Sequence, residues 1–226
     1  MTRCRAASTS STRNVTQPTH SSLLSSNSQP STAVRENVVM DTASGLQVRD
    51  ATGADAAACA AIYAHDVEHT TATFEEVAPT ADEMAGRIAA AQERHAWLVA
   101  ERGGHVVGYA YGGPFKARTA YRFSCEVSVY VHVTARGGGT GRTLYAALLD
   151  RMEALGMRMA CGGITLPNDA SLALHRALGF ETVGTYRRIG WKHGRWRDVT
   201  WVQKPLGGDG PPDSQDEGAA SPSGAP

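Results

Sequence analysis

The chain has 226 residues, and its 22 lysines and arginines are balanced by 22 aspartates and glutamates, so its formal net charge is zero. This balance predicts one soluble domain with tails, and no block of like charge indicates binding to nucleic acid or to an anionic membrane. No apolar run approaches the roughly 20 residues of a membrane-spanning helix. The four cysteines are scattered without a CxxC pair. They indicate neither a zinc ribbon nor a disulfide framework, and a reducing cytoplasm is expected.

Both ends of the chain have the composition of disordered segments. Residues 1–45 are rich in Ser and Thr and almost devoid of apolar periodicity, and residues 207–226 are acidic and rich in Pro, Gly and Ser. Such segments bury too little surface to offset the entropy of ordering. The N-terminal segment has some transit-peptide character, but we favour the alternative that translation begins at Met40. The folded domain is therefore expected over residues 46–206.

The folded part carries alternating strand and helix signals. Thr52 with Asp55 and Thr80 with Glu83 mark helix starts, and Gly103-Gly104 marks a hairpin turn. Strands are expected at 46–49, 96–101, 106–112, 125–133, 159–166, 180–191 and 197–204, and helices at 52–69, 80–94, 144–155 and 170–178. Strands paired first as hairpins and later crossed by helices predict an α+β fold, an α/β sandwich with a mixed central sheet flanked by helices.

The stretch from Cys125 to Tyr145 joins a strand to a helix through the glycine-rich turn 136–141. Glycines let the backbone approach a ligand closely, and free N–H groups with the helix dipole favour a phosphate. A Walker loop does not fit, because Arg136 stands at its first glycine and Arg142 replaces its lysine; Arg142 also stands at the third glycine of a dinucleotide fingerprint. The pattern R-x-x-G-x-G does fit, and it resembles the pyrophosphate loop of the GNAT N-acetyltransferases, which bind acetyl-CoA there.

A second motif has the spacing N-x-x-S-x-x-x-H-x-x-x-G-F and runs from Asn168 through Ser171 and His175 to Phe180. Asn168 is a good N-cap, and Ser171 and His175 share one helical face. Alone, this pattern also fits an ordinary capped helix with a surface histidine. In the right order and separation from the glycine loop, it resembles the last GNAT motif, in which the asparagine and serine contact the pantetheine arm.

Further stretches are similar to the phosphinothricin acetyltransferases within that family. They are Tyr63, 70–74, 97–101, 114–121 and 191–199. The resemblance covers nearly all of residues 46–204 and implies a GNAT acyl-CoA N-acyltransferase fold, acetyl-CoA as co-substrate and a homodimer. It also implies transfer of the acetyl group to the α-amine of phosphinothricin, methionine sulfoximine or methionine sulfone. The positions that depart from the usual pattern are Val127, Gly138, Thr140 and Trp191.

The resemblance and the chemistry of the residues together predict three sets of site residues. The cofactor-binding set is Val129, Val131, Arg136, Gly137, Gly138, Gly139, Thr140, Gly141, Arg142, Thr143, Asn168 and Ser171. The catalytic set is Glu126 as general base, His175 as acid or thiolate stabiliser and Tyr130 as a helper. The substrate-binding set is Phe74, Lys116, Arg118, Tyr121 and His193, with a dimer contact as the alternative role of His193.

Residue chemistry agrees with these roles and leaves alternatives open. A protonated amine must lose a proton before it attacks a thioester, which suits Glu126 as a base, but an exposed strand carboxylate or an ion-pair partner would look the same. Lys116 and Arg118 suit a carboxylate and a tetrahedral phosphinate or sulfoximine head. A solvated basic loop would show the same charge pattern.

One competing motif is His65-Asp66-Val67-Glu68-His69, which spells the inverted zinc-protease pattern H-x-x-E-H. A third protein ligand and a second signature are missing from the sequence pattern, so a polar helix end or a substrate-side loop is favoured and no metal is expected. Three function classes remain. They are an amino-acid N-acetyltransferase, which is favoured, a GNAT enzyme that acetylates a peptide N-terminus or a polyamine, and a non-catalytic acyl-CoA sensor.

Overall fold

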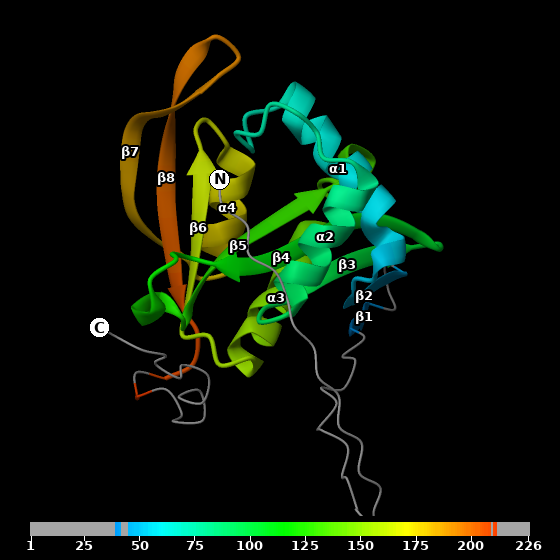
Figure 1. The fold of residues 1–226 in the computed structure, drawn as a ribbon, viewed down its shortest axis with the longest axis horizontal. Helices are drawn as coiled ribbons and strands as arrows, with labels where there is room; N and C mark the ends of the chain where they lie inside the picture. Colours follow the sequence, from blue (N-terminus) through cyan, green and yellow to red (C-terminus); the bar gives the residue numbers. More distant parts are fainter. Residues whose placement is uncertain (1–38, 42–44, 209, 212–226) are drawn as a thin grey trace, which may run out of the picture. The chain divides into compact units, whose positions relative to one another are not determined.

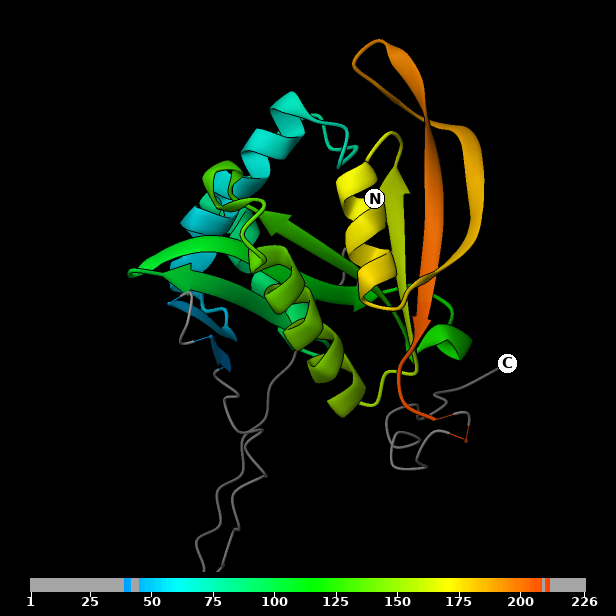
Figure 2. The ribbon, with the colours of Figure 1, turned by 180° about the vertical axis from the view of Figure 1, so that it is seen from behind.

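The computed structural model describes residues 39–41, 45–208 and 210–211. Within these residues, eight strands form one mixed sheet in the order β1-β2-β3-β4-β5-β6-β8-β7. Helices cover both faces of the sheet (Figures 1 and 2), so the expected sandwich with a mixed central sheet is confirmed. The disorder predicted for residues 1–38 and 212–226 lies outside the described residues.

The first half of the domain is antiparallel. The strands β1 (Val39–Asp41), β2 (Leu46–Asp50), β3 (Trp97–Arg102) and β4 (His105–Pro114) pair in sequence order. The helices α1 (Ala56–His69) and α2 (Ala81–Gln92) stand between β2 and β3, and both predicted capping boxes are present at Thr52 and Thr80. At the β3–β4 turn, Gly103 and Gly104 have φ angles of 58° and 80°, which glycine adopts without strain.

The second half alternates strands and helices. Its elements are β5 (Ser124–Val131), α3 (Thr140–Ala154), β6 (Met159–Thr165), α4 (Asp169–Ala177), β7 (Glu181–Lys192) and β8 (Arg195–Pro205). The helices α3 and α4 lie on the face of the sheet opposite to α1 and α2 (Figure 2). Each face has its own apolar core: Leu144, Leu148 and Met152 of α3 pack in one, and Tyr63 and Met84 of α1 and α2 pack in the other.

The parallel pairing between β5 and β6 is short. It covers Ser124 with Met159, Cys125 with Ala160 and Glu126 with Cys161. Beyond these three positions β5 continues to Val131 and β6 continues to Thr165, but the two strands no longer pair. The sheet is therefore open between β5 and β6 at the end where both strands finish.

The structure corrects the sequence prediction at several places, including the start of α3 at Thr140 rather than at Leu144. Val39–Asp41, which was assigned to the disordered extension, forms strand β1 against β2; a strand of three residues is too short to show periodicity. The strand that begins near Cys125 ends at Val131, because Val133 already belongs to a 3-10 turn. Helix α2 ends at Gln92 rather than near Arg94. No helix in the described part of the chain is long and apolar enough to cross a membrane.

Gly139 provides a test of the strand–loop–helix geometry. It is the N-cap of α3 with a φ angle of 82°, whereas the neighbouring Gly138 lies outside the left-handed region and an added Cβ there would meet no atom within 4 Å. Because a left-handed conformation costs an L-residue about 1–2 kcal/mol, Gly139→Ala should lower the free energy of unfolding by that amount. Gly138→Ala should be neutral or slightly stabilising. Equal losses in urea unfolding would contradict this backbone geometry.

Candidate active site

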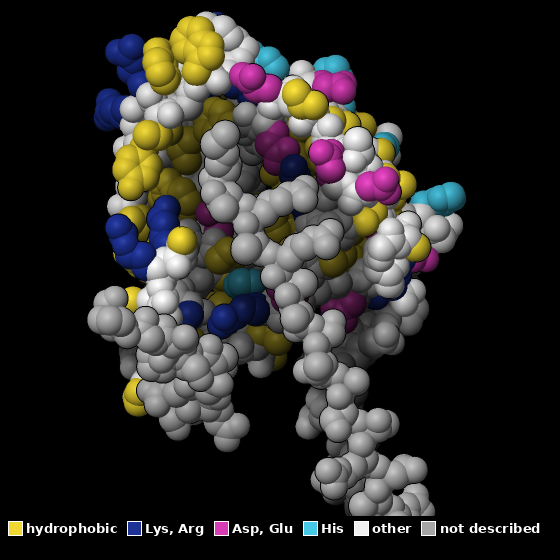
Figure 3. All heavy atoms as spheres, in the orientation of Figure 1, with side chains coloured by type: hydrophobic (Ala, Val, Ile, Leu, Met, Phe, Trp, Pro, Cys, Tyr) yellow, Lys and Arg dark blue, Asp and Glu magenta, His cyan; other side chains and the backbone are white. Residues whose placement is uncertain are grey.

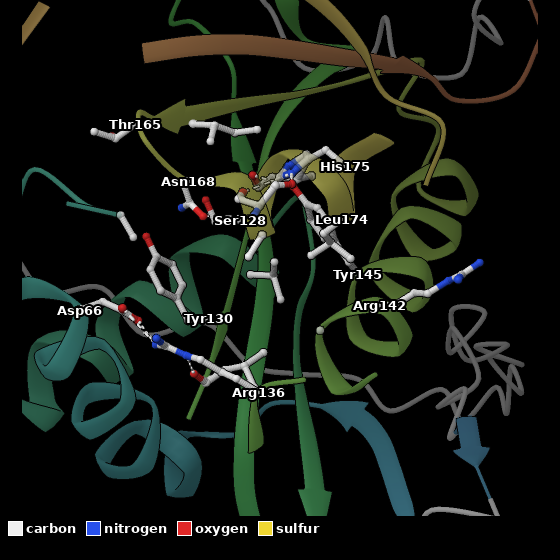
Figure 4. A pocket seen from close by; sticks show the side chains of 18 of the residues that line it. Asp66, Ser128, Tyr130, Arg136, Arg142, Tyr145, Thr165, Asn168, Leu174 and His175 are labelled. Atoms are coloured by element: carbon white, nitrogen blue, oxygen red, sulfur yellow. Dashed lines mark hydrogen bonds and ion pairs between the residues drawn. The ribbon is translucent and has the colours of Figure 1, made fainter. Parts of the chain in front are cut away.

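The opening between β5 and β6 holds a cavity of about 400 Å³. Its walls are the unpaired part of β5, residues 127–131, the end of β6, residues 163–165, the glycine loop and one side of α4 (Figure 4). Of the predicted cofactor-binding residues, those that line it are Val129, Val131, Arg136, Gly137, Gly139, Gly141, Arg142, Asn168 and Ser171. Gly138, Thr140 and Thr143 belong to the same loop and helix start without lining the cavity, and Thr140 is buried.

The glycine loop delivers the N-terminus of α3 to this cavity. Gly137 and Gly139 have φ angles of 80° and 82°, a conformation that turns the chain sharply into the helix. Since the N-cap is a glycine, no side chain caps the first turn of α3, and the first N–H groups of that turn remain available to a ligand. A Cβ on Gly141 would lie 3.4 Å from Val131. The loop therefore has the geometry of an anion site in which backbone N–H groups are the donors.

Arg136 is oriented by an ion pair that the sequence did not indicate. Its Nη2 lies 3.1 Å from both carboxylate oxygens of Asp66 on α1, and its Nε donates to the carbonyl oxygen of Val131 at 3.0 Å (Figure 4). Asp66 is buried and lines the cavity. The charge of Arg136 is thus already paired, and the guanidinium ties the glycine loop to α1 and to the end of β5.

Asp66 lies inside the H-x-x-E-H segment, which was interpreted as a polar helix end. That interpretation holds for Glu68 and His69, which are exposed, and is wrong for Asp66. Among the described residues, no group of three or more His, Cys, Asp or Glu side chains could hold a metal ion. Asp66 shares a buried helical face with Ile62 and Tyr63, and its charge is paired by Arg136, 70 residues further along the chain.

The second motif is anchored as its capping pattern predicts. The Asn168 side chain accepts a hydrogen bond from the Ser171 N–H at 3.1 Å, which caps α4. His175 is only 5% exposed, so the alternative of a surface histidine is wrong. Its Nδ1 lies 2.8 Å from the carbonyl oxygen of Ser171 and its Nε2 lies 3.0 Å from the Tyr145 hydroxyl.

These contacts assign the protons of His175. A carbonyl oxygen can only accept, so Nδ1 carries the hydrogen and Nε2 presents its lone pair to Tyr145. Burial lowers the pKa of the imidazole. A neutral ring with this tautomer has no hydrogen on Nε2 to give to a thiolate, so the geometry favours a positioning role over an acid role. Tyr145 was not among the predicted residues; its signal, a tyrosine on the apolar face of a helix, is that of an ordinary core residue.

Glu126 is half-buried on the opposite face of β5 from Cys125 and Val127. Burial raises the pKa of its carboxyl, and the nearby charge of Lys116 opposes that rise. A second cavity, of about 600 Å³, lies by the β4–β5 loop, and Lys116, Tyr121 and Cys161 line it. Cys161 is the ladder partner of Glu126, so the predicted base stands beside this second cavity.

The predicted substrate-binding residues fall into separate places. Lys116 and Tyr121 line the second cavity. Arg118 directly precedes the 3-10 turn at Thr119–Tyr121, makes no capping hydrogen bond with its side chain and lines neither cavity. Phe74 and His193 lie where the α1–α2 loop meets the β7–β8 hairpin. There the Phe74 ring packs directly on Gly190, and His193 Nε2 lies 3.1 Å from the carbonyl oxygen of Thr70.

Tyr130 belongs to both the first cavity and the aromatic core on the α1 side. Its ring makes an edge contact with Tyr63 at 4.9 Å and stacks on Tyr109 at 5.3 Å, and it lines the cavity (Figure 4). Burial raises the pKa of its hydroxyl well above 10. Tyr130 therefore keeps its proton at neutral pH and can only act as a hydrogen-bonding group.

Comparison with known proteins agrees with this geometry. The family described as acetyltransferase (GNAT) domain matches residues 48–201. Phosphinothricin N-acetyltransferase of Streptomyces viridochromogenes is 43% identical over 167 residues, 74% of this chain and 91% of that protein. The L-methionine sulfoximine/L-methionine sulfone acetyltransferase of Salmonella typhimurium is 36% identical over 170 residues, 75% of this chain and 99% of that protein.

A solved structure adds the cofactor. A GNAT superfamily phosphinothricin acetyltransferase from Sinorhizobium meliloti, in complex with acetyl-CoA, is 40% identical with a TM-score of 0.73, over 76% of this chain and 95% of that one. The chain therefore belongs to the GNAT acetyltransferase family. It is an acetyl-CoA-dependent acetyltransferase, as the sequence resemblance implied.

The lowered pKa of His175 predicts a pH effect on stability. Below about pH 6.5 the unfolded chain binds a proton that buried His175 resists, so stability is retained above that pH and falls as the pH drops. His175→Gln should reduce the fall in the free energy of unfolding between pH 7.5 and pH 5. The exposed His105 offers a control, because His105→Gln should leave the pH dependence nearly as in the unmodified protein. Identical slopes for all three proteins would contradict the burial argument.

Proposed function

We propose that the protein transfers the acetyl group of acetyl-CoA to the α-amine of a small amino acid with a tetrahedral anionic or polar head, such as phosphinothricin, methionine sulfoximine or methionine sulfone. One observation carries this proposal. The cleft with its anion loop begins on β5 at Val127, and the residue just before it is Glu126, a carboxylate whose pKa is raised. The names of the relatives support the acceptor class.

In the proposed reaction, nitrogen attacks the thioester carbonyl carbon, the C–N bond forms, and the C–S bond breaks to release CoA as a thiolate. The ammonium group loses two protons in total. Glu126 accepts one, directly or through a water, and the thiolate takes the other. N–H groups of β5 beyond the ladder, in the segment that includes Val129 and Val131, are the donors for the developing oxyanion.

The described cysteines are not suited to act as a nucleophile that would carry the acetyl group in a covalent enzyme intermediate. Among the described residues Cys59, Cys125 and Cys161 are buried and free, and burial raises the pKa of the Cys59 and Cys125 thiols to about 12. A thiol nucleophile requires a lowered pKa. Direct transfer between the two bound substrates is therefore the proposed route.

The second cavity supports a compact acceptor. Lys116 Nζ lies 4.8 Å from the centre of the Phe115 ring and 5.6 Å from that of Trp201, so one positive charge is surrounded by aromatic walls. Such a site suits an amino acid whose head is anionic and whose chain is short. Tyr121 lines the same cavity and would contact the same head. Arg118, Phe74 and His193 line neither cavity and have no part in this proposed acceptor site.

We further propose a cytoplasmic homodimer. Its support is a group of apolar side chains on β7 and the start of β8, all about half exposed or more, which a partner subunit would cover: Val183, Tyr186, Ile189, Trp191 and Trp196. Free buried cysteines suit a reducing compartment. Resistance to phosphinothricin would follow if that amino acid proves to be a good acceptor.

The test is thiol release from acetyl-CoA by the purified full chain with a panel of acceptors. The panel contains phosphinothricin, methionine sulfoximine, methionine sulfone, ordinary amino acids, a peptide with a free N-terminus and a polyamine. Fast turnover with a tetrahedral-headed amino acid would support the proposal. Turnover only with the peptide or the polyamine would replace it with the other enzyme class, and acetyl-CoA binding without any turnover would indicate a sensor.

Glu126→Gln separates chemistry from binding. It removes the proposed base while keeping the shape of the side chain, so the rate should fall by about 100-fold or more, within the range for loss of general-base catalysis. The dissociation constant for acetyl-CoA should change little. Glu93→Gln, at an exposed position after α2, is the matched control and should keep the full rate. A Glu126→Gln protein as fast as the control would remove Glu126 from the mechanism.

Lys116 should tune the pH profile of the reaction. Its positive charge lowers the pKa of Glu126, so Lys116→Met should raise that pKa and move the acid limb of kcat/KM to higher pH. Arg122→Met is the control, because Arg122 is an exposed cation on the same loop that stacks on Phe123 instead. The shift should be specific to Lys116→Met. An acid limb that stays in place in both variants would show that Lys116 does not act on the base.

A further inference from the structure

The point where β5 and β6 separate has two neighbouring residues that no longer pair with each other. Glu126 and Cys161 are the last ladder partners, so Val127 on β5 and Gly162 on β6 are the first residues beyond the ladder. A carbonyl oxygen left without a partner at such a buried position carries a penalty of about 1–3 kcal/mol. A hydrogen-bond donor for this carbonyl oxygen is therefore expected at the apex of the cleft, together with side chains that fill the space there.

The first group at the apex is the Tyr145 hydroxyl. Tyr145 comes from α3 and is completely buried. Its hydroxyl lies 3.1 Å from the carbonyl oxygen of Val127 and 3.0 Å from Nε2 of His175. The tyrosine therefore reaches the first unpaired residue of β5 and supplies a donor to its carbonyl oxygen.

The second group is the imidazole of His175, which comes from α4. It covers Gly162, since a Cβ on that glycine would lie 3.1 Å from Nε2. The ring meets Tyr145 edge-on at 5.1 Å and Phe180 at 4.9 Å. His175 thus occupies the space beside the first unpaired residue of β6, and the absence of a side chain at Gly162 makes that space.

We propose that Tyr145 and His175 form a polar wedge at the apex of the cleft, which holds β5 and β6 apart so that the acetyl group of the bound thioester can reach Glu126. Tyr145 is the positioning residue in this arrangement. The wedge joins α3 to α4 through one hydrogen bond and touches both strands, as Figure 4 shows for the two side chains. The proposal rests on the proposed acetyl transfer, because it assigns the wedge a role in that reaction.

The number of hydrogen-bond donors in the wedge makes Tyr145 its critical member. Nδ1 of His175 donates to Ser171, so Nε2 is an acceptor, and the Val127 carbonyl oxygen is an acceptor as well. Tyr145 has one hydroxyl hydrogen, so the two acceptors share it in a three-centre hydrogen bond. Loss of that hydroxyl leaves two buried acceptors without a donor, although the ring that fills the apex remains.

The position of the wedge links it to rate rather than to cofactor affinity. Val127 follows Glu126 directly, so a shift of β5 at Val127 moves the proposed base relative to the thioester. Displacing reacting groups by about 1 Å can cost about 100-fold in rate. The anion loop begins at Arg136 and is held separately by Asp66, so binding of the pyrophosphate should survive a change at the apex.

The experiment compares Tyr145→Phe with Tyr109→Phe in the full chain. Tyr109 is an equally buried tyrosine in the other core, so its variant controls for the general cost of removing a buried hydroxyl. Tyr145→Phe should lower kcat by about 10–100-fold and change the dissociation constant for CoA less than about threefold. Tyr109→Phe should keep kcat within about twofold. Equal kcat in both variants, or a loss confined to CoA affinity, would overturn the proposal.

A spectroscopic measurement tests the wedge without any acceptor. Nitrogen-15 spectra of the histidine rings, with His175 assigned by its absence in His175→Gln, should show an unprotonated Nε2 that accepts a hydrogen bond. In Tyr145→Phe the chemical shift of Nε2 should move toward that of an unprotonated ring nitrogen that accepts no hydrogen bond, while Nδ1 stays protonated. An Nε2 that carries hydrogen in the unmodified protein, or one that Tyr145→Phe does not move, would refute the wedge even if no acceptor were acetylated.

A second pair of variants guards against a Tyr145→Phe protein that does not fold. His175→Gln retains an acceptor that Tyr145 can serve, whereas His175→Leu fills the space without one. CoA affinity should be similar in the two variants, and His175→Gln should keep the higher kcat. A higher kcat in His175→Leu would contradict the wedge. If the unmodified protein acetylates no acceptor, the proposed function is refuted. The nitrogen-15 measurement does not require turnover, so it still tests the wedge in that case.

Discussion

The structure depends on the fact that the parallel pairing between β5 and β6 stops after a few residues. β5 and β6 pair at three positions and then continue without pairing to each other, which opens the middle of the sheet. The crossover through α3 makes this possible, because a parallel connection needs a helix that packs on the sheet and returns the chain. The same crossover brings the N-terminus of α3 to the mouth of the opening. The cleft and its anion site are therefore two consequences of one topological feature.

Few side-chain charges in the cleft are free, which is why we propose backbone N–H groups as the donors to the acyl donor. Arg136 is neutralised by Asp66 and fixed to β5, and Arg142 is exposed and directed away from the other labelled side chains (Figure 4). On the other side of β5, burial keeps Glu126 at a raised pKa that suits proton transfer. A carboxylate held in this state lowers the stability of the fold, a cost that functional sites commonly carry.

Local signals in the sequence predicted much of the fold, and tertiary placement explains what they missed. Capping boxes at Thr52 and Thr80, the Gly103-Gly104 turn and the glycine loop depend on neighbouring residues alone, so they can be recognised from the chain. The burial of Asp66 and His175 depends on partners 70 and 30 residues away, Arg136 and Tyr145, and no periodicity reports such contacts. The same limit explains why Phe74 and His193 were grouped with Lys116, although the structure places them at a different loop.

Amide hydrogen exchange of β5 with and without acetyl-CoA would test the central claim most directly. The unpaired side of Val127–Val131 faces the cavity, so bound acetyl-CoA should slow exchange in that segment and at the first turn of α3, where N–H groups would gain acceptors. β2 and β3, which pair on both sides, should be unaffected. Slower exchange confined to the β4–β5 loop around the second cavity, with β5 unchanged, would contradict the assignment of the cleft as the site of the acyl donor.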